Sequence, residues 1–368
     1  HRRGCRGGLR LRKKPRSHGG VTQRHPRSLL LSGAFAILCS MQIGNLTFDK
    51  ALALAPMEDV TDPPFRALCK QMGADIMYTE FISSEGLIRD AQKSIEKLDM
   101  LPDEHPVGIQ IFGHSEESMV QAAQIATQAK PDIIDINFGC PVKKVVTKCA
   151  GAGALQDIPR LLRITESVVT ATHLPVTIKT RLGWDENNKI IGELAEQVQD
   201  LGIQALTVHG RTRSQLYRGE ADWTLIGKIK ENPRMIIPII GNGDINSGAK
   251  ALEAKNKYGV DGIMIGRASI GNPWIFKEIK QYLAGNTEPL IVGIDERVDV
   301  CKEHIIRSIE WKGLTRSMNE MRKHYSNYFR GFPNFKEFKM KLMLCQDPET
   351  IYQILEEIRE YYKNYQGE

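Results

Sequence analysis

Eight short apolar runs rich in Val and Ile recur along the chain at intervals of roughly 25 to 35 residues, with helical patterns between them. The runs cover residues 51–57, 74–80, 107–113, 133–140, 175–181, 205–211, 237–244 and 262–268. They are continuously apolar rather than alternating, as expected for strands of a parallel sheet that is buried on both faces. Ser115 and Asp157 are predicted to cap two of the intervening helices. The repeat therefore predicts βα units.

Each run begins apolar and carries a polar or reactive residue at its C-terminal end. These residues are Met57, Glu80, Gln110, Asn137 with Cys140, Lys179, His209, Asn242 and Arg267. In a (β/α)₈ barrel the C-terminal ends of all eight strands meet on one face, where active sites are built. We therefore predict an α/β protein with a (β/α)₈ barrel. The alternative is a doubly wound open sheet, in which the eight strands lie side by side.

The pattern changes after residue 289 to longer amphipathic segments, predicted as helices over 296–312, 314–329, 333–344 and 347–363. We predict three regions: a disordered or non-native extension over 1–40, the barrel over 41–290, and a smaller all-helical domain over 291–368. The Arg-rich residues 2–27 and the apolar run 29–39 resemble a targeting signal, which is the alternative for the extension. No clear small-residue cleavage site follows that run.

Net charge is uninformative for the whole chain. The formal charge is +6, but residues 1–40 hold ten Lys or Arg and no acid, so the remainder sums to −4. Residues 297–345 are locally basic, with eleven Lys or Arg against five Asp or Glu, and cations alternate with aromatics over 321–332. That mixture suits a nucleic-acid backbone with bases stacked beside it. The alternative is an amphipathic helix with core aromatics and solvated charges.

The seven cysteines include no C-x-x-C pair, which argues against a disulfide framework and against a structural zinc site. We predict no metal site. The apolar run 29–39 is about half of the roughly 20 residues that span a bilayer. We therefore expect no membrane span and a cytoplasmic protein, and no obligate protein partner is evident.

Glycine-rich turns follow the seventh and eighth runs, over 241–248 and 265–274. Barrels of this type commonly bind phosphate in these two loops, where glycines allow backbone N–H groups to approach. Arg267 adds a charge-assisted contact. A phosphate here suits the ribityl phosphate of FMN, with Lys179 near the flavin ring as a cation that stabilises the reduced form. The alternative is two tight turns without a ligand.

Cys140 ends the fourth run between Gly139 and Pro141, which force a sharp turn. Its loop continues into Lys143, Lys144 and Lys148, an improbable sequence for a buried segment. We therefore expect an exposed, reactive thiol at the barrel mouth. The alternative is a buried inert cysteine, the fate expected for Cys69.

Ten segments together resemble the bacterial dihydrouridine synthases. They are LAPMEDVTDPPFR, TEF, QIFG, DINFGCPVKKVV, AGAGAL, IKTRLGW, VHGRTR, GNGDI, GRASIGNPW and MRKH, spread over residues 41–362. Other FMN barrels, such as dihydroorotate dehydrogenases, share the phosphate loops but lack the Gly-Cys-Pro loop with its trailing lysines and the MRKH helix. The resemblance implies FMN as cofactor, NADPH as electron source, tRNA as substrate and Cys140 as the catalytic acid.

Cofactor contacts implied by position are Pro56, Met57, Gln110, Lys179, His209, Asn242, Gly243, Gly266 and Arg267, to which we add the adjoining Glu58 and Asp244. Residues expected to face tRNA are Asn137, Lys143, Lys144, Lys148, Arg181, Arg211, Arg213, Arg322 and Lys323. Cys149 stands where relatives often have Gly or Leu, and is a candidate for a second oxidisable thiol.

The implied reaction adds hydride to C6 of uracil and a proton to C5. The acid must be protonated at rest, as an ordinary thiol is at neutral pH. The target uridine must also be flipped out to reach a flavin inside the barrel. Two rival functions stay open: an FMN reductase of a small ene or pyrimidine, and a non-catalytic tRNA-binding module.

Overall fold

The computed structural model describes residues 40–365. The extension predicted over 1–40 falls almost entirely outside these residues. Among residues 40–365, no helix combines the length and the apolar character that a membrane crossing requires.

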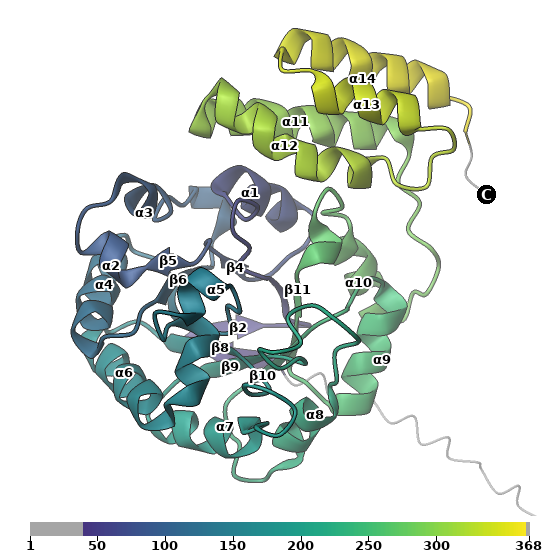
Figure 1. Cartoon of the computed structure of the whole chain (residues 1–368). Helices are drawn as coiled ribbons and strands as arrows, with labels where there is room; N and C mark the ends of the chain where they lie inside the picture. The colour runs from purple at the N-terminus through teal and green to yellow at the C-terminus, as the bar shows by residue number, and fades with distance from the viewer. Residues whose placement is uncertain (1–39, 366–368) are drawn as a thin grey trace, which may run out of the picture. The chain divides into compact units, whose positions relative to one another are not determined.

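Eight parallel strands form the centre of the molecule and are ringed by helices (Figure 1). Their hydrogen-bonded order follows the chain from β4 onward and ends at β3. The strands are β3 (Leu52–Leu54), β4 (Met77–Tyr78), β6 (Val107–Phe112), β7 (Ile133–Phe138), β8 (Val176–Arg181), β9 (Ala205–His209), β10 (Ile239–Asn242) and β11 (Gly262–Ile265). A parallel bridge between Ala53 and Ile76 joins β3 to the segment that enters β4, which closes the barrel. The predicted barrel is confirmed, and the open sheet is excluded.

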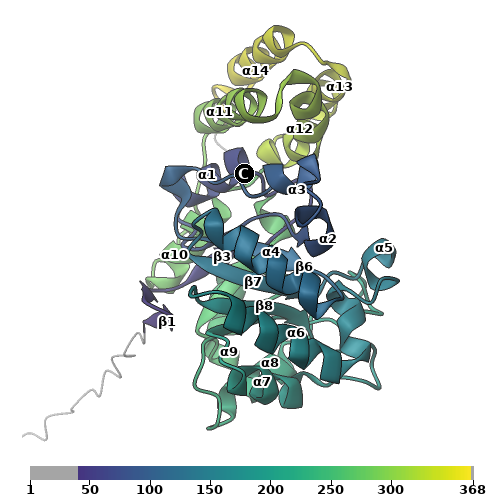
Figure 2. The ribbon, with the colours of Figure 1, turned by 90° about the vertical axis from the view of Figure 1, so that its left-hand side faces the viewer.

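Helices follow the strands and cover the outside of the barrel (Figures 1 and 2). They are α1 (Pro63–Gln71), α4 (Glu116–Gln128), α6 (Ile158–Ala171), α7 (Ile191–Asp200), α8 (Thr224–Glu231), α9 (Gly248–Tyr258) and α10 (Ile275–Leu283). Ser115 and Asp157 cap α4 and α6, each accepting a backbone N–H three residues ahead. Their capping roles, predicted from the sequence, are confirmed.

Short strands, helices and turns lie at the barrel mouth and at the opposite end of the barrel. The mouth carries β5 (Ile82–Ser83), α2 (Ser84–Leu87), α3 (Gln92–Glu96) and α5 (Lys143–Val146), with 3-10 turns at Gly151–Gln156 and Arg267–Ser269; a further 3-10 turn at Pro102–Glu104 precedes β6. The hairpin of β1 (Met41–Ile43) and β2 (Leu46–Phe48) packs its apolar side chains with those of β3, β10 and β11. The sequence analysis missed this hairpin, although a two-residue Gly44-Asn45 turn between alternating runs is a hairpin signal.

Four helices follow the barrel: α11 (Ile294–Lys312), α12 (Leu314–Tyr328), α13 (Lys336–Leu344) and α14 (Pro348–Tyr362). Each lies within three residues of its predicted bounds. They share a second hydrophobic core, which also takes in Leu68 of α1 and Trp274. We call α11–α14 the helical region. The division of the chain at residue 290 into separate domains stays a prediction.

Candidate active site

The residues predicted at the strand ends lie together at the mouth of the barrel. Strand register places Asn137 beside Lys179, and His209 beside Asn242. Gln110 and Asn137 are joined directly, because the Asn137 amide donates to Gln110 Oε1 at 2.8 Å. Barrel closure therefore converts scattered sequence positions into one polar surface.

A buried hydrogen-bond network fixes the turn that carries Cys140. Asn137 Oδ1 accepts the backbone N–H groups of Gly139 at 2.9 Å and Cys140 at 2.8 Å. Gln110 Nε2 donates to Asp135 at 2.6 Å. Burial raises the pKa of Asp135 to about 6, against the effect of that hydrogen bond. Asn137 is 5 % exposed and supports the turn, and its contact with RNA stays a prediction.

Cys140 is only 7 % exposed, which contradicts the predicted exposed thiol. The reason is the 3-10 turn at Gly151–Gln156, which packs on the Gly-Cys-Pro turn: Ala152 N–H donates to the Cys140 carbonyl at 3.0 Å. A side chain at Gly151 would come within 2.9 Å of that carbonyl oxygen. Burial raises the pKa of the Cys140 thiol, and the cations Arg181 and Lys179 offset this only in part. The thiol is therefore protonated at neutral pH.

Arg181 is buried beneath this turn rather than exposed at the mouth. Its guanidinium donates to the carbonyls of Gly139 at 2.7 Å, Thr212 at 3.0 Å and Leu216 at 2.8 Å. Arg181 is 2 % exposed, and its contact with RNA stays a prediction. Three carbonyl acceptors converge there, and one fork-shaped guanidinium satisfies them all.

Lys179 extends from β8 into the barrel mouth. Burial, followed by repulsion from Arg181, lowers the pKa of Lys179 to about 8, although Asp135 acts in the opposite direction. No hydrogen bond to its ammonium group is present within residues 40–365. Lys179 is partly buried, and its three donors, without an acceptor among these residues, offer a place for a ligand's acceptor atoms.

A cluster of polar and charged residues lies at the C-terminal ends of β9, β10 and β11. Its members are His209, Arg211, Asp244 and Arg267. Arg211 pairs with Asp244 at 2.7 Å, and Arg267 approaches the same carboxylate at 3.2 Å. Arg211 is 1 % exposed, and its contact with RNA stays a prediction. Burial, reinforced by Lys179 and the arginines, lowers the pKa of His209 well below its usual range. His209 is therefore neutral, and Nε2 faces Arg211 Nη1 at 3.3 Å as an acceptor.

The glycines of the two phosphate-type loops differ in how closely their neighbours pack. Gly243 has φ +124°, and a side chain there would clash with Ala221 at 2.6 Å and lie 3.0 Å from His209. At Gly266 an added Cβ would be in ordinary contact with its nearest atom at 3.7 Å. Arg267 is exposed next to Gly266, and its guanidinium lies 5.1 Å from the ring centre of Tyr217. The sequence analysis missed Tyr217, which had no pattern to mark it.

The residues predicted to face tRNA from the rim are spread over three elements. Lys143, Lys144 and Lys148 are exposed on and just after α5. Arg213 stacks on Trp184 at 4.6 Å, which occupies one face of its guanidinium. Arg322 is partly buried, and Lys323 donates to the backbone carbonyl of Asp59 at 3.1 Å.

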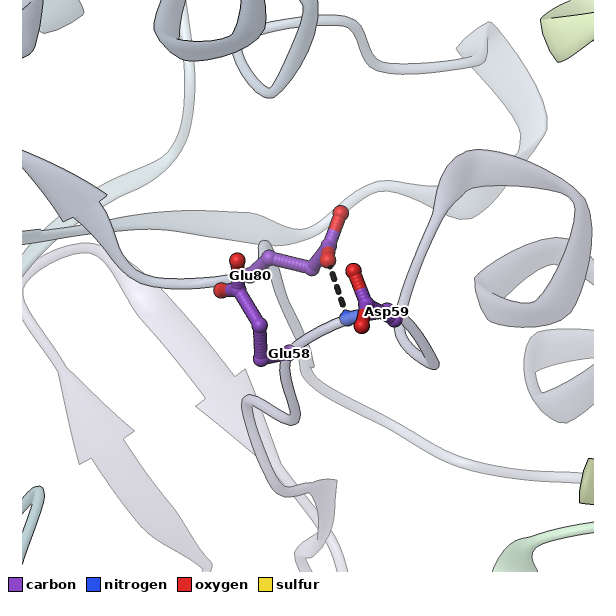
Figure 3. A group of neighbouring side chains, drawn as sticks. All are labelled: Glu58, Asp59 and Glu80. Carbon is purple, nitrogen blue, oxygen red and sulfur yellow. Dashed lines mark hydrogen bonds between the residues drawn. The ribbon is translucent and has the colours of Figure 1, made fainter. Parts of the chain in front are cut away.

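Three carboxylates, those of Glu58, Asp59 and Glu80, lie together beside the loop after β3, with ligand atoms within 4.8 Å of one another (Figure 3). Glu80 accepts the backbone N–H of Asp59. Burial raises the pKa of Glu80 to about 7, despite Lys97. Lys97 pairs with Glu58 at 2.6 Å and Lys323 lies 3.4 Å from Asp59, so protein cations already balance this cluster.

A wide cleft opens beside these carboxylates, with a volume of about 1220 Å³. Phe81, Phe112 and Val142 line it together with Lys144 and Lys148 from the α5 side, and Trp311 and Arg316 line it from the helical region. Aromatic and cationic side chains therefore face the same space.

The family comparison agrees with this geometry. Residues 53–365 match the model of the family described as dihydrouridine synthase (Dus). The chain belongs to this family. It is 38 % identical over 323 residues to a probable tRNA-dihydrouridine synthase of Rickettsia conorii, covering 88 % of this chain and 96 % of the relative. It is 39 % identical over 313 residues to tRNA-dihydrouridine synthase B of Pseudomonas putida, covering 85 % and 92 %. The resemblance inferred from the sequence is confirmed.

Solved structures of low sequence identity share the barrel of this Dus-family chain. A 2-naphthoyl-CoA reductase matches with a TM-score of 0.54 at 11 % identity, covering 68 % of this chain and 52 % of its own. A histamine dehydrogenase from Rhizobium sp. 4-9 matches with a TM-score of 0.53 at 12 % identity, covering 73 % and 50 %. At such identities the likeness concerns the fold alone.

Proposed function

We propose that this chain is a tRNA-dihydrouridine synthase: it reduces the C5–C6 double bond of tRNA uridines, with FMN as cofactor, NADPH as reductant and Cys140 as proton donor. The observation that carries the proposal is the pairing, at one barrel mouth, of a protonated thiol on a braced turn with the unpaired ammonium of Lys179. Membership of the Dus family supports the same reaction, because the curated relatives carry this name.

The residues at the mouth fit FMN. Gly243 and Gly266 lie in the loops where barrels bind phosphate, and Arg267 stands beside Gly266 with an exposed guanidinium. His209, neutral and with Nε2 facing Arg211, has its Nδ1 proton free to donate to a ligand oxygen. Pro56 and Met57 follow β3, and the Met57 sulfur would lie 3.9 Å from a Cβ added at Gly266.

Asp244 and Glu58 have indirect roles in this proposal. Asp244 orients Arg211 and Arg267, and its own charge would repel a phosphate if it made direct contact. The carboxylate of Glu58 is turned to Lys97, which leaves only its backbone for the cofactor. Asp244 therefore positions the arginines, and Glu58 contributes through its backbone only.

Bound FMN, reduced by NADPH, would supply the hydride that C6 of uracil receives. Lys179 holds a positive charge at the mouth, which favours the anionic reduced cofactor. The Cys140 thiol keeps its proton at neutral pH and delivers it to C5. Asn137 and Arg181 keep the turn rigid, so that the donor stays in position. The target uridine enters flipped out of its helix.

The affinity for FMN is expected to fall as the pH rises through about 8, because Lys179 then loses its proton. Its pKa of about 8 in the cofactor-free protein means that the ammonium form, which an anionic ligand prefers, dominates below that pH. Lys179→Met should bind FMN more weakly and show no such fall, whereas Lys179→Arg should hold its affinity to higher pH. Quenching of FMN fluorescence measures all three. If the FMN affinity of Lys179→Met fell with pH as much as that of the unaltered chain, Lys179 would not be the group that titrates.

Replacing Lys143, Lys144 and Lys148 together by alanine is expected to weaken tRNA binding and lower the slope of log affinity against log salt by about 2 to 3. The three ammonium groups are exposed, so the fold should be unaffected. A matched control removes three exposed lysines from the outer helices: Lys228, Lys250 and Lys257. Filter binding across salt concentrations should show wild-type behaviour for the control. Equal losses in both triple variants would contradict a specific RNA surface at α5.

The direct test incubates the purified chain with FMN, unmodified tRNA and either NADPH or NADH, and counts dihydrouridine by mass spectrometry. Dihydrouridine in tRNA is expected, and none from free uracil or uridine. Turnover of free uracil or of enones without tRNA would favour the small-molecule reductase instead. A colourless protein that takes up no FMN yet binds tRNA would favour the non-catalytic module.

A further inference from the structure

We infer that His324 is a positioning residue that fastens the helical region to the loop after β11 and so fixes the proposed phosphate site. We call residues 266–274 the β11 loop. The inference deepens the proposed function and rests on it, because that function assigns the cofactor phosphate to this loop. His324 is the histidine of the MRKH segment, and the proposed reaction assigns it no role.

His324 makes one buried hydrogen bond to the β11 loop. His324 lies on α12 with 3 % exposure, and its Nδ1 accepts the backbone N–H of Gly271 at 3.1 Å. An acceptor at Nδ1 places the ring proton on Nε2, so the imidazole is neutral. Burial and the neighbouring His304 lower the pKa of His324 well below its usual range, which keeps this bond at any physiological pH.

The two backbones are also in close contact at this point. Gly271 has φ +61°, and an added Cβ would lie 2.3 Å from the His324 carbonyl oxygen and 2.9 Å from Asn327 Cβ. Only glycine fits this approach. The β11 loop is therefore seated on α12 without space for an independent shift.

Hydrogen bonds within the loop connect Gly271 to the phosphate end. Ser269 donates to the Gly266 carbonyl through its backbone N–H at 2.9 Å and its hydroxyl at 2.8 Å. Asn272 N–H in turn donates to the Ser269 carbonyl at 2.9 Å. Gly266 and Arg267 thus belong to one hydrogen-bonded unit with Gly271. A displacement at Gly271 moves the groups that are proposed to bind phosphate.

The ring of His324 is wedged between α1 and α11. Its centre lies 4.9 Å from the ring centre of Phe65 and 4.6 Å from that of His304. Phe65 begins α1, whose N-cap Asp62 pairs with Lys312 of α11. Because β3 pairs with β11, the loops after these two strands are neighbours, and both are held by the helical region.

Three variants test the inference. His324→Leu removes the acceptor and leaves the Gly271 N–H buried without a partner. His324→Asn restores an acceptor, because the Asn amide oxygen occupies the place of Nδ1. The control is Leu355→Ala: Leu355 is also fully buried, but it lies on α14 in the core of the helical region, and α14 packs on α11 and α13. Each variant is measured for melting temperature, FMN dissociation constant and hydrogen exchange at the Gly271 amide.

We expect His324→Leu to weaken FMN binding about tenfold and to accelerate exchange at Gly271, the scale of one lost buried hydrogen bond. His324→Asn should return the dissociation constant to within about twofold of the unaltered chain. Leu355→Ala should lower the melting temperature while leaving FMN affinity and Gly271 exchange unchanged. Equal effects of His324→Leu and Leu355→Ala on FMN affinity and Gly271 exchange, or none from His324→Leu, would overturn the inference.

The exchange measurement separates this inference from the proposed function. If the unaltered chain takes up no FMN, the proposed function fails. Exchange at Gly271 in the cofactor-free protein still decides whether His324 holds the loop: faster exchange in His324→Leu alone supports it, and unchanged exchange refutes it.

Discussion

Replacing Cys140 by alanine is expected to slow dihydrouridine formation by about 10²–10⁴-fold, the usual contribution of a general acid. Burial keeps the thiol protonated well above neutral pH, and its turn is held by Asn137 and Arg181. The variant loses the proton donor and retains the cofactor contacts. FMN affinity and the visible flavin spectrum should therefore match those of the unaltered chain.

Single-turnover reaction of reduced enzyme with unmodified tRNA is the appropriate measurement, because it isolates the step that follows cofactor reduction. Cys140→Ser is the matched control: its hydroxyl occupies the same place but is a much weaker acid, so an intermediate rate is expected. Reduction of FMN by NADPH should proceed equally in all three proteins. Full activity of Cys140→Ala would rule out the thiol as the acid.

The largest expected effect on stability comes from Arg66, a residue of α1 that the sequence analysis did not single out. Its guanidinium pairs with Glu104 at 2.6 Å, and both side chains are at most 1 % exposed. It also donates to the carbonyls of Thr61 at 2.8 Å and Asp99 at 2.6 Å. Arg66→Met should lower the free energy of unfolding by about 3–5 kcal/mol, because Glu104 is left as a buried unpaired charge.

Denaturant titration of the full chain measures this loss. Arg66→Met combined with Glu104→Leu removes both charges and is expected to recover much of the stability, since an apolar pair avoids the desolvation cost. A surface pair serves as control: Arg163→Met breaks the ion pair with Glu116, which is 2.7 Å long but exposed, and should cost about 0–1 kcal/mol. A loss at Arg66 no greater than at Arg163 would show that burial does not decide the effect.

Much of the fold was predictable because its signals are local. Continuous apolar runs mark strands buried on both faces, and Ser115 and Asp157 cap helices through bonds to residues only three positions away. The hairpin at Met41–Phe48 was equally local and was overlooked because the two strands have three residues each. The division into domains and the roles of individual site residues stay predictions.

The sequence indicated which residues belong to the candidate site better than it indicated how exposed their side chains are to solvent. Lys179, His209 and Asn242 follow from their places at strand ends, because barrel geometry sends every such end to one face. Cys140 was identified from its Gly-Cys-Pro turn, yet the trailing lysines suggested an exposed loop. Lys143, Lys144 and Lys148 are exposed on and just after α5, whereas the Cys140 thiol, only a few residues before them, is buried.

By itself, the sequence determined the eight βα repeats, the polar strand ends and the family, because these depend on the order and spacing of residues along the chain. Only the tertiary structure decided which charges are buried. Arg181 closes on carbonyls 31 to 42 residues away, and Arg211 reaches Asp244 across 33 residues. Such partners meet only when the barrel closes. Solvent exposure, and with it the raised pKa of the Cys140 thiol, therefore depends on how the loops pack and not on any local pattern.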